Sequence, residues 1–197
     1  MNIAVLVSGG GTNLQALIDA GNLGGEIKLV ISSSADAFAL KRAEKAGVDT
    51  AVILRQDYGS AQEYSKALVA KLREYNTDLV VLAGFMIVID KCFTDAFKNR
   101  IINVHPSLIP AFCGKGFYGL RVHEAALARG VKLTGATVHF VNEECDGGPI
   151  ILQKCVSVLD DDTPETLQKR VMQEAEWDIL PKAVRLFCEG KLKGRAL

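Results

Sequence analysis

Residues 3–13 of the chain read IAVLVSGGGTN, an apolar run followed by a loop with three glycines. A short run rich in Val and Ile that ends at a turn signal is typical of a strand buried on both faces. Residues 14–20 continue with the pattern of a helix, which Thr12 or Asn13 could cap. A strand, a tight loop and a helix in this order predict the opening unit of a parallel α/β sheet.

The same alternation continues along the chain. It predicts an α/β fold with an open, Rossmann-like, mostly parallel sheet, helices on both faces, and ligands at the carboxyl ends of the strands. Two longer strands at 134–141 and 149–158 predict an antiparallel extension in the C-terminal half. Thr163 before Pro164 predicts the start of a long final helix. The other expected elements are strands at 28–32, 50–53, 79–82 and 101–104, and helices at 35–46, from Ser60, and at 90–98.

Composition limits the class of protein. The chain has 197 residues without a repeat or linker, which predicts one domain over 1–197. Lys plus Arg number 23 and Asp plus Glu number 23, and this balance argues against a nucleic-acid partner. No apolar run reaches the roughly 18 residues of a membrane helix, and the N-terminus lacks the basic region of a signal peptide. Five cysteines without a Cys-x-x-Cys pair suit reduced thiols, so we expect a cytoplasmic protein without membrane contact.

The glycine loop SGGGTN at 8–13 predicts an anion site. Backbone N–H groups at a helix N-terminus attract anions, and glycine lets an anion approach closely. The loop is not a dinucleotide fingerprint, because Leu14 stands where the third glycine would be, and no Gly-Lys-Ser/Thr of a Walker loop follows. We expect a single phosphate on Gly11, Thr12 and Asn13. The alternative is a tight turn that needs glycine only for its backbone angles.

Polar side chains follow the apolar strand at 101–104. Asn103 and His105 are two residues apart and share one face of the strand, and Pro106 holds His105 extended. Asp146, before two glycines, offers an acidic partner. An amide and an imidazolium can donate to an oxyanion, while a carboxylate raises the histidine pKa and helps to move a proton. The trio predicts acyl transfer between nitrogens, and the alternative is a histidine satisfied within the core.

Two other kinds of site fit the sequence less well. It has no Gly-x-Ser-x-Gly turn to present a nucleophilic serine, and neither Cys113 nor Cys145 has positional support as a nucleophile. The three histidines, His105, His123 and His139, lack the spacing of paired zinc ligands, so no metal is expected.

The segment NVHPSLIP at 103–110, with HF at 139–140 and DGGP at 146–149, resembles the signature of the 10-formyltetrahydrofolate-dependent formyltransferases. The opening SGGGTNLQ at 8–15 narrows this resemblance to the branch that formylates the amine of 5-phosphoribosylglycinamide in de novo purine (IMP) biosynthesis. The resemblance runs from Asn2 to about Phe187. It implies an enzyme that takes 10-formyltetrahydrofolate as cosubstrate, needs no metal, has small molecules as partners, and is a monomer or homodimer.

The resemblance also implies roles for matching residues, with the phosphate site in 1–100 and the catalytic and folate-binding groups in 101–197. The catalytic residues would be Asn103, His105 and Asp146, with His105 as proton donor. The ribonucleotide would bind to Gly11, Thr12, Asn13, Gln173 and Glu176, and Glu174 is a second candidate for the ribose contact. The folate would contact Met86, Ile87, Val88, Ile89, Asn103, Asn142, Glu143, Glu144, Cys145 and Asp146.

Three departures from the family pattern affect these roles. Residues 173–177 read QEAEW where members usually show Glu-His, which leaves Glu174 as an alternative to Glu176. Ala61 stands about where many members carry a basic residue near the folate tail, so no such role is transferred. The loop AFCGKGFYGLRV at 111–122 is longer and richer in glycine than in compact members, and we expect it to be a mobile flap.

Three other functions remain as alternatives. In a formyltetrahydrofolate hydrolase water replaces the amine, but such an enzyme needs no phosphate loop. A methionyl-tRNA formyltransferase would need a tRNA-binding domain for which this chain has no room. A nonenzymatic nucleotide-binding regulator would not need the intact trio of Asn103, His105 and Asp146.

Overall fold

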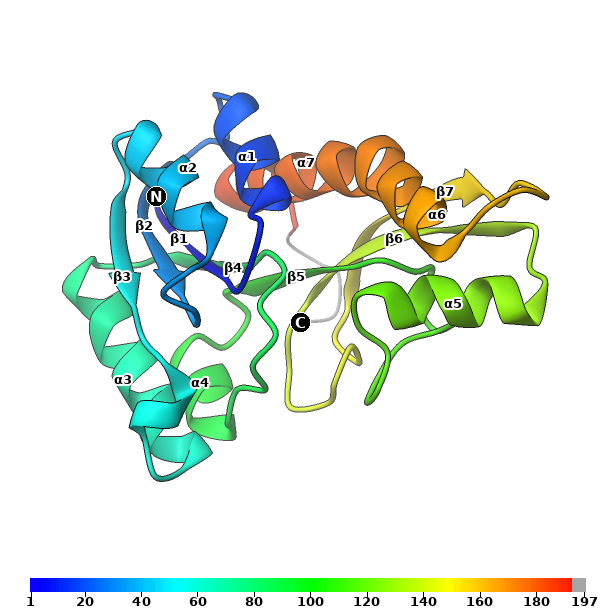
Figure 1. Ribbon diagram of the computed structural model, residues 1–197. Helices are drawn as coiled ribbons and strands as arrows, with labels where there is room; N and C mark the ends of the chain where they lie inside the picture. Colours follow the sequence, from blue (N-terminus) through cyan, green and yellow to red (C-terminus); the bar gives the residue numbers. More distant parts are fainter. Residues whose placement is uncertain (193–197) are drawn as a thin grey trace.

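The computed structural model describes residues 1–192. One seven-stranded sheet runs through the molecule in the order β3-β2-β1-β4-β5-β6-β7 (Figure 1). The first five strands in this order pair in parallel, whereas β6 is antiparallel to both β5 and β7. The predicted open sheet with an antiparallel extension is confirmed. The strands are β1 (Asn2–Val7), β2 (Glu26–Ser32), β3 (Asp49–Val52), β4 (Leu79–Leu82), β5 (Ile101–His105), β6 (Leu133–Phe140) and β7 (Ile150–Ser157).

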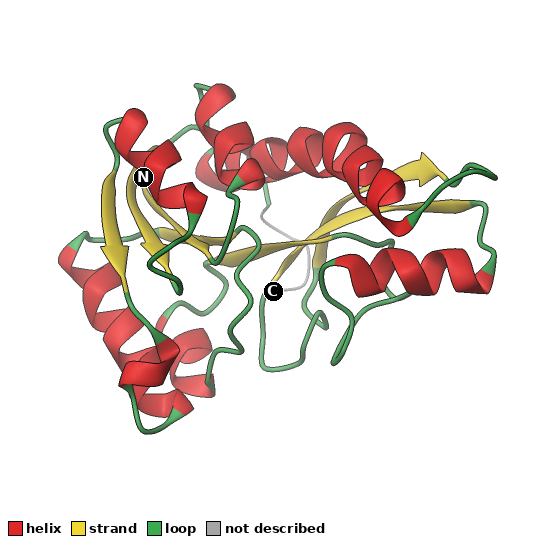
Figure 2. Cartoon of the chain, in the orientation of Figure 1, coloured by secondary structure: helices red, strands yellow, loops and turns green. Residues whose placement is uncertain are grey.

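Helices cover both faces of the sheet (Figure 2). Side chains of β1 alternate between them: Ile3 and Val5 join a cluster with α1, α2 and α7, whereas Ala4 and Leu6 join one with α3 and α4. This double burial explains why β1 is a continuous apolar run. The helical elements are α1 (Thr12–Asp19), α2 (Phe38–Lys45), η1 (Arg55–Asp57), α3 (Ala61–Glu74), α4 (Lys91–Ala96), α5 (Leu120–Arg129), α6 (Pro164–Val171), η2 (Met172–Glu176) and α7 (Trp177–Cys188).

Two helix starts differ from the sequence expectation. Gly11, with a left-handed φ of 70°, is the N-cap of α1, so neither Thr12 nor Asn13 caps it. A Cβ at Gly11 would lie 2.5 Å from the Ala39 Cβ, because α2 packs directly on the glycine loop. The second helix begins at Phe38 rather than at residue 35.

The C-terminal helix begins as predicted but is not one regular helix. The Thr163 side chain caps α6 with Pro164 in the first turn, which the sequence predicts. A π-helical turn, η2, then separates α6 from α7. Within the described residues no helix is long and apolar enough to cross a membrane. The expected domain of 1–197 includes residues 193–197, which lie outside the described part.

Candidate active site

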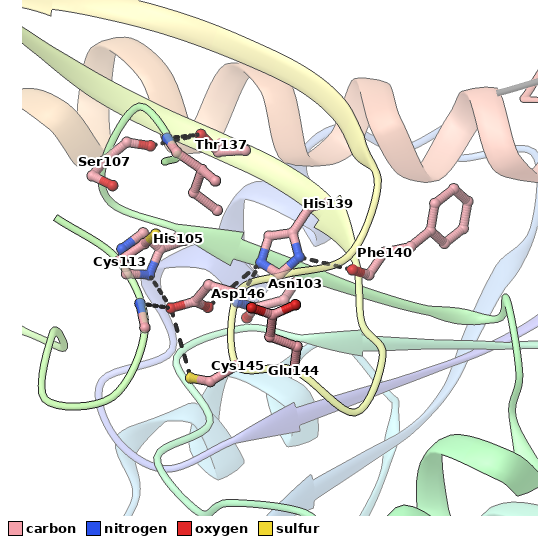
Figure 3. Close-up of polar contacts among 12 residues, drawn as sticks. Asn103, His105, Ser107, Cys113, Thr137, His139, Phe140, Glu144, Cys145 and Asp146 are labelled. Atoms are coloured by element: carbon pink, nitrogen blue, oxygen red, sulfur yellow. Dashed lines mark hydrogen bonds and ion pairs between the residues drawn. The ribbon is translucent and has the colours of Figure 1, made fainter. Parts of the chain in front are cut away.

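The three predicted catalytic side chains lie together at the carboxyl end of β5 (Figure 3). Asn103 and His105 belong to β5, and Asp146 reaches them from the loop between β6 and β7. The His105 Nδ1 is 3.5 Å from the Asp146 Oδ2, and these side chains are 5% and 9% exposed. The structure therefore brings the sequence-predicted trio into one largely buried cluster.

The backbone after β6 turns sharply to deliver the Asp146 carboxylate. Asp146 itself has a left-handed φ of 55°. Two residues later the chain passes so close to the Phe140 carbonyl that any Cβ on Gly148 would collide with it. The backbone N–H of Gly114 donates a 2.8 Å hydrogen bond to the Asp146 Oδ2. This turn and this bond fix the carboxylate beside His105.

His139 is a member of the cluster to which sequence reasoning gave no role. It lies opposite Asn103 in the β5–β6 register, and its Nε2 is 3.2 Å from the Asn103 Nδ2 and 3.6 Å from the Asp146 Oδ1. Its Nδ1 is 2.8 Å from the Phe140 carbonyl oxygen. Because a carbonyl only accepts, Nδ1 carries a proton and Nε2 can accept from Asn103. The sequence feature that could have identified His139 is that it is the one histidine within the apolar strand β6.

The loop expected at 111–122 ends at Gly119, since residues 120–122 belong to α5, and its first half contacts the catalytic pair. The His105 Nε2 lies 2.9 Å from the Phe112 carbonyl oxygen, and Phe112 has a left-handed φ of 50°. A carbonyl at this distance requires a proton on Nε2, so Nδ1 is the nitrogen that faces Asp146. Together with the Gly114 bond, this contact means that the expected flap covers His105 and Asp146 in this structure.

The charge state of His105 depends on burial more than on Asp146. Burial lowers its pKa, and this outweighs the opposite effects of Asp146 and the Phe112 carbonyl. Burial alone would raise the pKa of Asp146, but the nearby His139 ring, the charge of His105 and the Gly114 N–H bring it down to about 2. The expected effect of the carboxylate, which is to raise the pKa of His105, is present, but desolvation is larger and sets the direction of the net shift. At neutral pH the pair is an ionised carboxylate and a neutral imidazole.

A second polar cluster lies at the N-terminus of α1. Gly11, Thr12 and Asn13 form this end of the helix, and the Asn13 Nδ2 donates a 2.6 Å hydrogen bond to the Glu176 Oε2. Glu176 is buried, and burial raises its pKa to about 7, partly offset by the Asn13 bond. Gln173 and Glu174 are exposed. Glu176 is thus the acidic residue that meets the glycine loop.

The π turn explains how Glu176 points inward. In a π turn, residues five apart lie on the same face, whereas an α-helix brings residues four apart together. Val171 and Glu176 are five apart and both buried, and Ala175 is buried with them. The extra residue in η2 therefore places Glu176 on the inner face of the helix.

The segment at 86–89 divides between core and surface. Ile87 and Ile89 pack against the cluster under α3 and α4, which is a structural role. Met86 and Val88 are 51% and 84% exposed. Four of the other predicted folate-contacting residues, 142–145, are exposed in the turn after β6, whereas Asp146 and Asn103 lie in the catalytic cluster. In the chain order an apolar segment thus precedes β5, and a polar turn leads to Asp146.

Known proteins match this chain over nearly its full length. The formyl transferase family matches residues 1–184. The phosphoribosylglycinamide formyltransferase of Escherichia coli is 41% identical over 98% of this chain and 90% of its own length. The crystal structure of glycinamide ribonucleotide transformylase 1 from Symbiobacterium toebii has a TM-score of 0.92 and 46% identity, and covers 99% of this chain and 92% of its own. The Bacillus halodurans phosphoribosylglycinamide formyltransferase structure has a TM-score of 0.89, 34% identity and full coverage of both chains.

These matches agree with the two polar clusters at the carboxyl ends of the strands. The trio at the end of β5 is suited to acyl transfer, and the cluster at the N-terminus of α1 is suited to binding a phosphate. The identity and coverage in both directions exclude a likeness confined to a common α/β core. The chain belongs to the formyl transferase family and, within it, to the phosphoribosylglycinamide formyltransferases.

Proposed function

We propose that this chain transfers the formyl group of 10-formyltetrahydrofolate to the amine of 5-phosphoribosylglycinamide, a step of purine biosynthesis. The observation that carries the proposal is the buried cluster of Asn103, His105 and Asp146, on the same sheet edge as the glycine loop. An acyl transfer needs oxyanion donors and a proton carrier, and the first cluster contains both. A phosphorylated acceptor needs an anion site, which the second cluster offers.

The residues around the trio fit a flat, mostly apolar cosubstrate with a polar ring. Met86 and Val88 expose apolar surface without being needed in the core. Asp146 offers a buried carboxylate, and the turn at 142–146 offers backbone groups to the edge of a pterin ring. When bound, the cosubstrate would supply an activated formyl group. Its contacts would be the ten residues implied by the family resemblance, with Ile87 and Ile89 acting mainly as support.

The neutral imidazole of His105 gives a definite proton path. Its Nδ1 takes the proton that the attacking amine loses, because Nε2 is already committed to the Phe112 carbonyl. The imidazolium formed in this way is paired with Asp146, and its positive charge stabilises the oxyanion, to which the Asn103 amide donates. His105 then returns the proton to the leaving nitrogen. His139 holds the Asn103 amide in place and does not need to touch substrate.

The ribonucleotide would be held by its two ends. Gly11, Thr12 and Asn13 bind the phosphate, Glu176 accepts from a ribose hydroxyl, and Gln173 lies on the outer side of the same turn. Residues 1–100 thus carry the phosphate site, and 101–197 carry the catalytic trio and the polar folate turn. The enzyme would work in the cytoplasm as a monomer or homodimer with small-molecule partners.

A spectrophotometric assay tests the proposal and its nearest alternative. The purified chain is incubated with a 10-formyl folate, with and without the ribonucleotide. Deformylated folate should appear only when the ribonucleotide is present. Release at the same rate without ribonucleotide would instead mean a hydrolase. Tight ribonucleotide binding without any release of folate would mean a binding protein.

A further inference from the structure

One ion pair joins the two segments proposed to hold the folate. The Lys91 ammonium contacts the carboxylate of Glu143 and also lies 3.2 Å from the Asp95 Oδ1. Lys91 follows the apolar segment at 86–89 and is the first residue of α4, whereas Glu143 belongs to the turn at 142–146. The pair therefore bridges the apolar and the polar side of the proposed cosubstrate site.

The backbone of Lys91 is fixed, while its side chain can exchange partners. The Asp90 side chain caps α4, and the Asp90 N–H donates a 2.9 Å hydrogen bond to the Ser65 Oγ of α3. The side chains of Lys91 and Glu143 are 60% and 62% exposed. Ion pairs this exposed contribute about 0–1 kcal/mol, so another carboxylate can replace Glu143.

Lys91 follows exposed apolar residues in the chain, and the first two residues of the neighbouring helix α3, Ala61 and Gln62, carry no charge, while Lys66 lies one turn further along. Met86 and Val88 are exposed just before Lys91 in the chain. Ala61 is the first residue of α3, and the first turns of α3 and α4 are adjacent, since the Cys92 Sγ contacts the Gln62 carbonyl. The basic group at this end of the site therefore comes from α4 and not from the start of α3.

We propose that Lys91 binds a glutamyl carboxylate of the folate cosubstrate, which displaces Glu143 from the ammonium. A ligand with an aromatic middle and an anionic end would place its rings over Met86 and Val88 and its carboxylate at Lys91. Lys91 is then a specificity-determining residue that distinguishes glutamylated donors from donors without glutamate. This inference rests on the proposed function and adds to it the group that recognises the anionic end.

The test compares two formyl donors, a 10-formyl folate and the corresponding 10-formyl pteroate, which lacks the glutamate. The variant Lys91→Ala should raise KM for the glutamylated donor about fivefold, with kcat and the KM for ribonucleotide unchanged. The pteroate should show the same KM with both proteins. Glu143→Gln, which removes the competing carboxylate, should lower KM for the glutamylated donor about twofold. The matched control is Lys132→Ala, which removes an exposed lysine paired with Asp160 outside the site.

Direct binding separates this inference from the proposed function. Calorimetric titration with the two deformylated ligands should show the same preference for glutamate, lost in Lys91→Ala and weakened by salt. An active enzyme whose Lys91→Ala variant binds both ligands as the original protein does would overturn the inference and leave the proposed function intact. An equal loss for both ligands would also overturn it. Failure of the unmodified protein to transfer formyl from either donor would overturn the proposed function instead.

Discussion

The side-chain amide of Asn13 donates a 2.6 Å hydrogen bond to Glu176, 163 residues later in the chain. The bond joins the first turn of α1, just after the glycine loop, to the π turn before α7. Burial raises the pKa of Glu176 to about 7, so the charge of this cluster changes near neutral pH. The two proposed ribonucleotide contacts are therefore one unit whose binding strength depends on the ionisation of Glu176.

Replacing Glu176 with Gln should weaken ribonucleotide binding with little effect on chemistry. The loss of a charged acceptor is expected to raise KM for the ribonucleotide about tenfold, with kcat nearly unchanged. Steady-state kinetics at saturating formyl donor measures both values. Glu174→Gln is the matched control, because Glu174 is an exposed carboxylate in the same turn. Equal effects of the two substitutions would contradict the assignment of the ribose contact to Glu176.

The same variant should change how stability depends on pH. Because the folded pKa of Glu176 is about 7 and the unfolded value is 4.5, the folded protein binds the extra proton, and stability falls as pH rises between these values. Glu176→Gln removes this loss, so its stability relative to the original protein should improve by about 3 kcal/mol from pH 4.5 to pH 8. Urea unfolding at the two pH values gives the difference. If the stability difference between Glu176→Gln and the original protein is the same at both pH values, the pKa of Glu176 is not raised by folding.

Residue types and their spacing were enough to predict most of the fold and the trio. The apolar run of β1, the same-face placement of Asn103 and His105, and the cap at Thr163 follow from periodicity and steric rules that act over a few residues. Asp146 could be proposed as the partner of His105 from its residue type and the two glycines after it, but its distance from His105 depends on the turn after β6, which local rules do not predict.

Other features of the site could not be predicted from the sequence. The Phe112 carbonyl fixes the proton of His105, and a backbone group carries no residue-type signal. The π turn packs against β6 and β7, which are tertiary contacts, so helical periodicity predicts only a continuous helix. The resting charge of His105 depends on how completely the flap and the sheet bury it, which a sequence does not specify.

Replacing Asp146 with Asn should lower kcat by about 100-fold to 10,000-fold, because the imidazolium of His105 loses its partner. The pH profile should also shift. Asp146 raises the pKa of His105 against a larger effect of burial, so its removal should move the acid limb of kcat/KM to lower pH. Rate measurements from pH 5 to pH 9 follow this limb. An acid limb that moves to higher pH would contradict the role of His105 as the base.

Buried His123 should limit stability in acid. It is fully buried in α5, its two ring nitrogens have no hydrogen-bond partner among the described residues, and burial lowers its pKa to about 4. Since the unfolded state binds the proton more readily, stability falls as pH drops from 6.5 to 4. His123→Leu should remove about 3 kcal/mol of this acid loss, measured by urea unfolding at pH 7 and pH 4.5. Parallel pH dependence in the two proteins would show that His123 is not buried as a neutral group.

Deleting Glu174 tests whether the extra residue of the π turn is needed for ribonucleotide binding. After this deletion Glu176 becomes the fourth residue after Val171, so a regular α-helix would still present it to Asn13. We expect KM for the ribonucleotide to stay within about threefold and the protein to remain folded. Glu174→Ala, which keeps the chain length, is the control.

A deletion outside the turn should behave differently. Removing Gln168 from α6 would rotate Leu167 and the preceding turn by about 100° relative to the buried Val171, which breaks the apolar face of the helix. This variant should lose much of its stability, whereas the Glu174 deletion should not, and circular dichroism during heating compares them. If the Glu174 deletion folds but raises KM more than tenfold, the widened turn itself positions Glu176, and an α-helix of the same sequence cannot replace it.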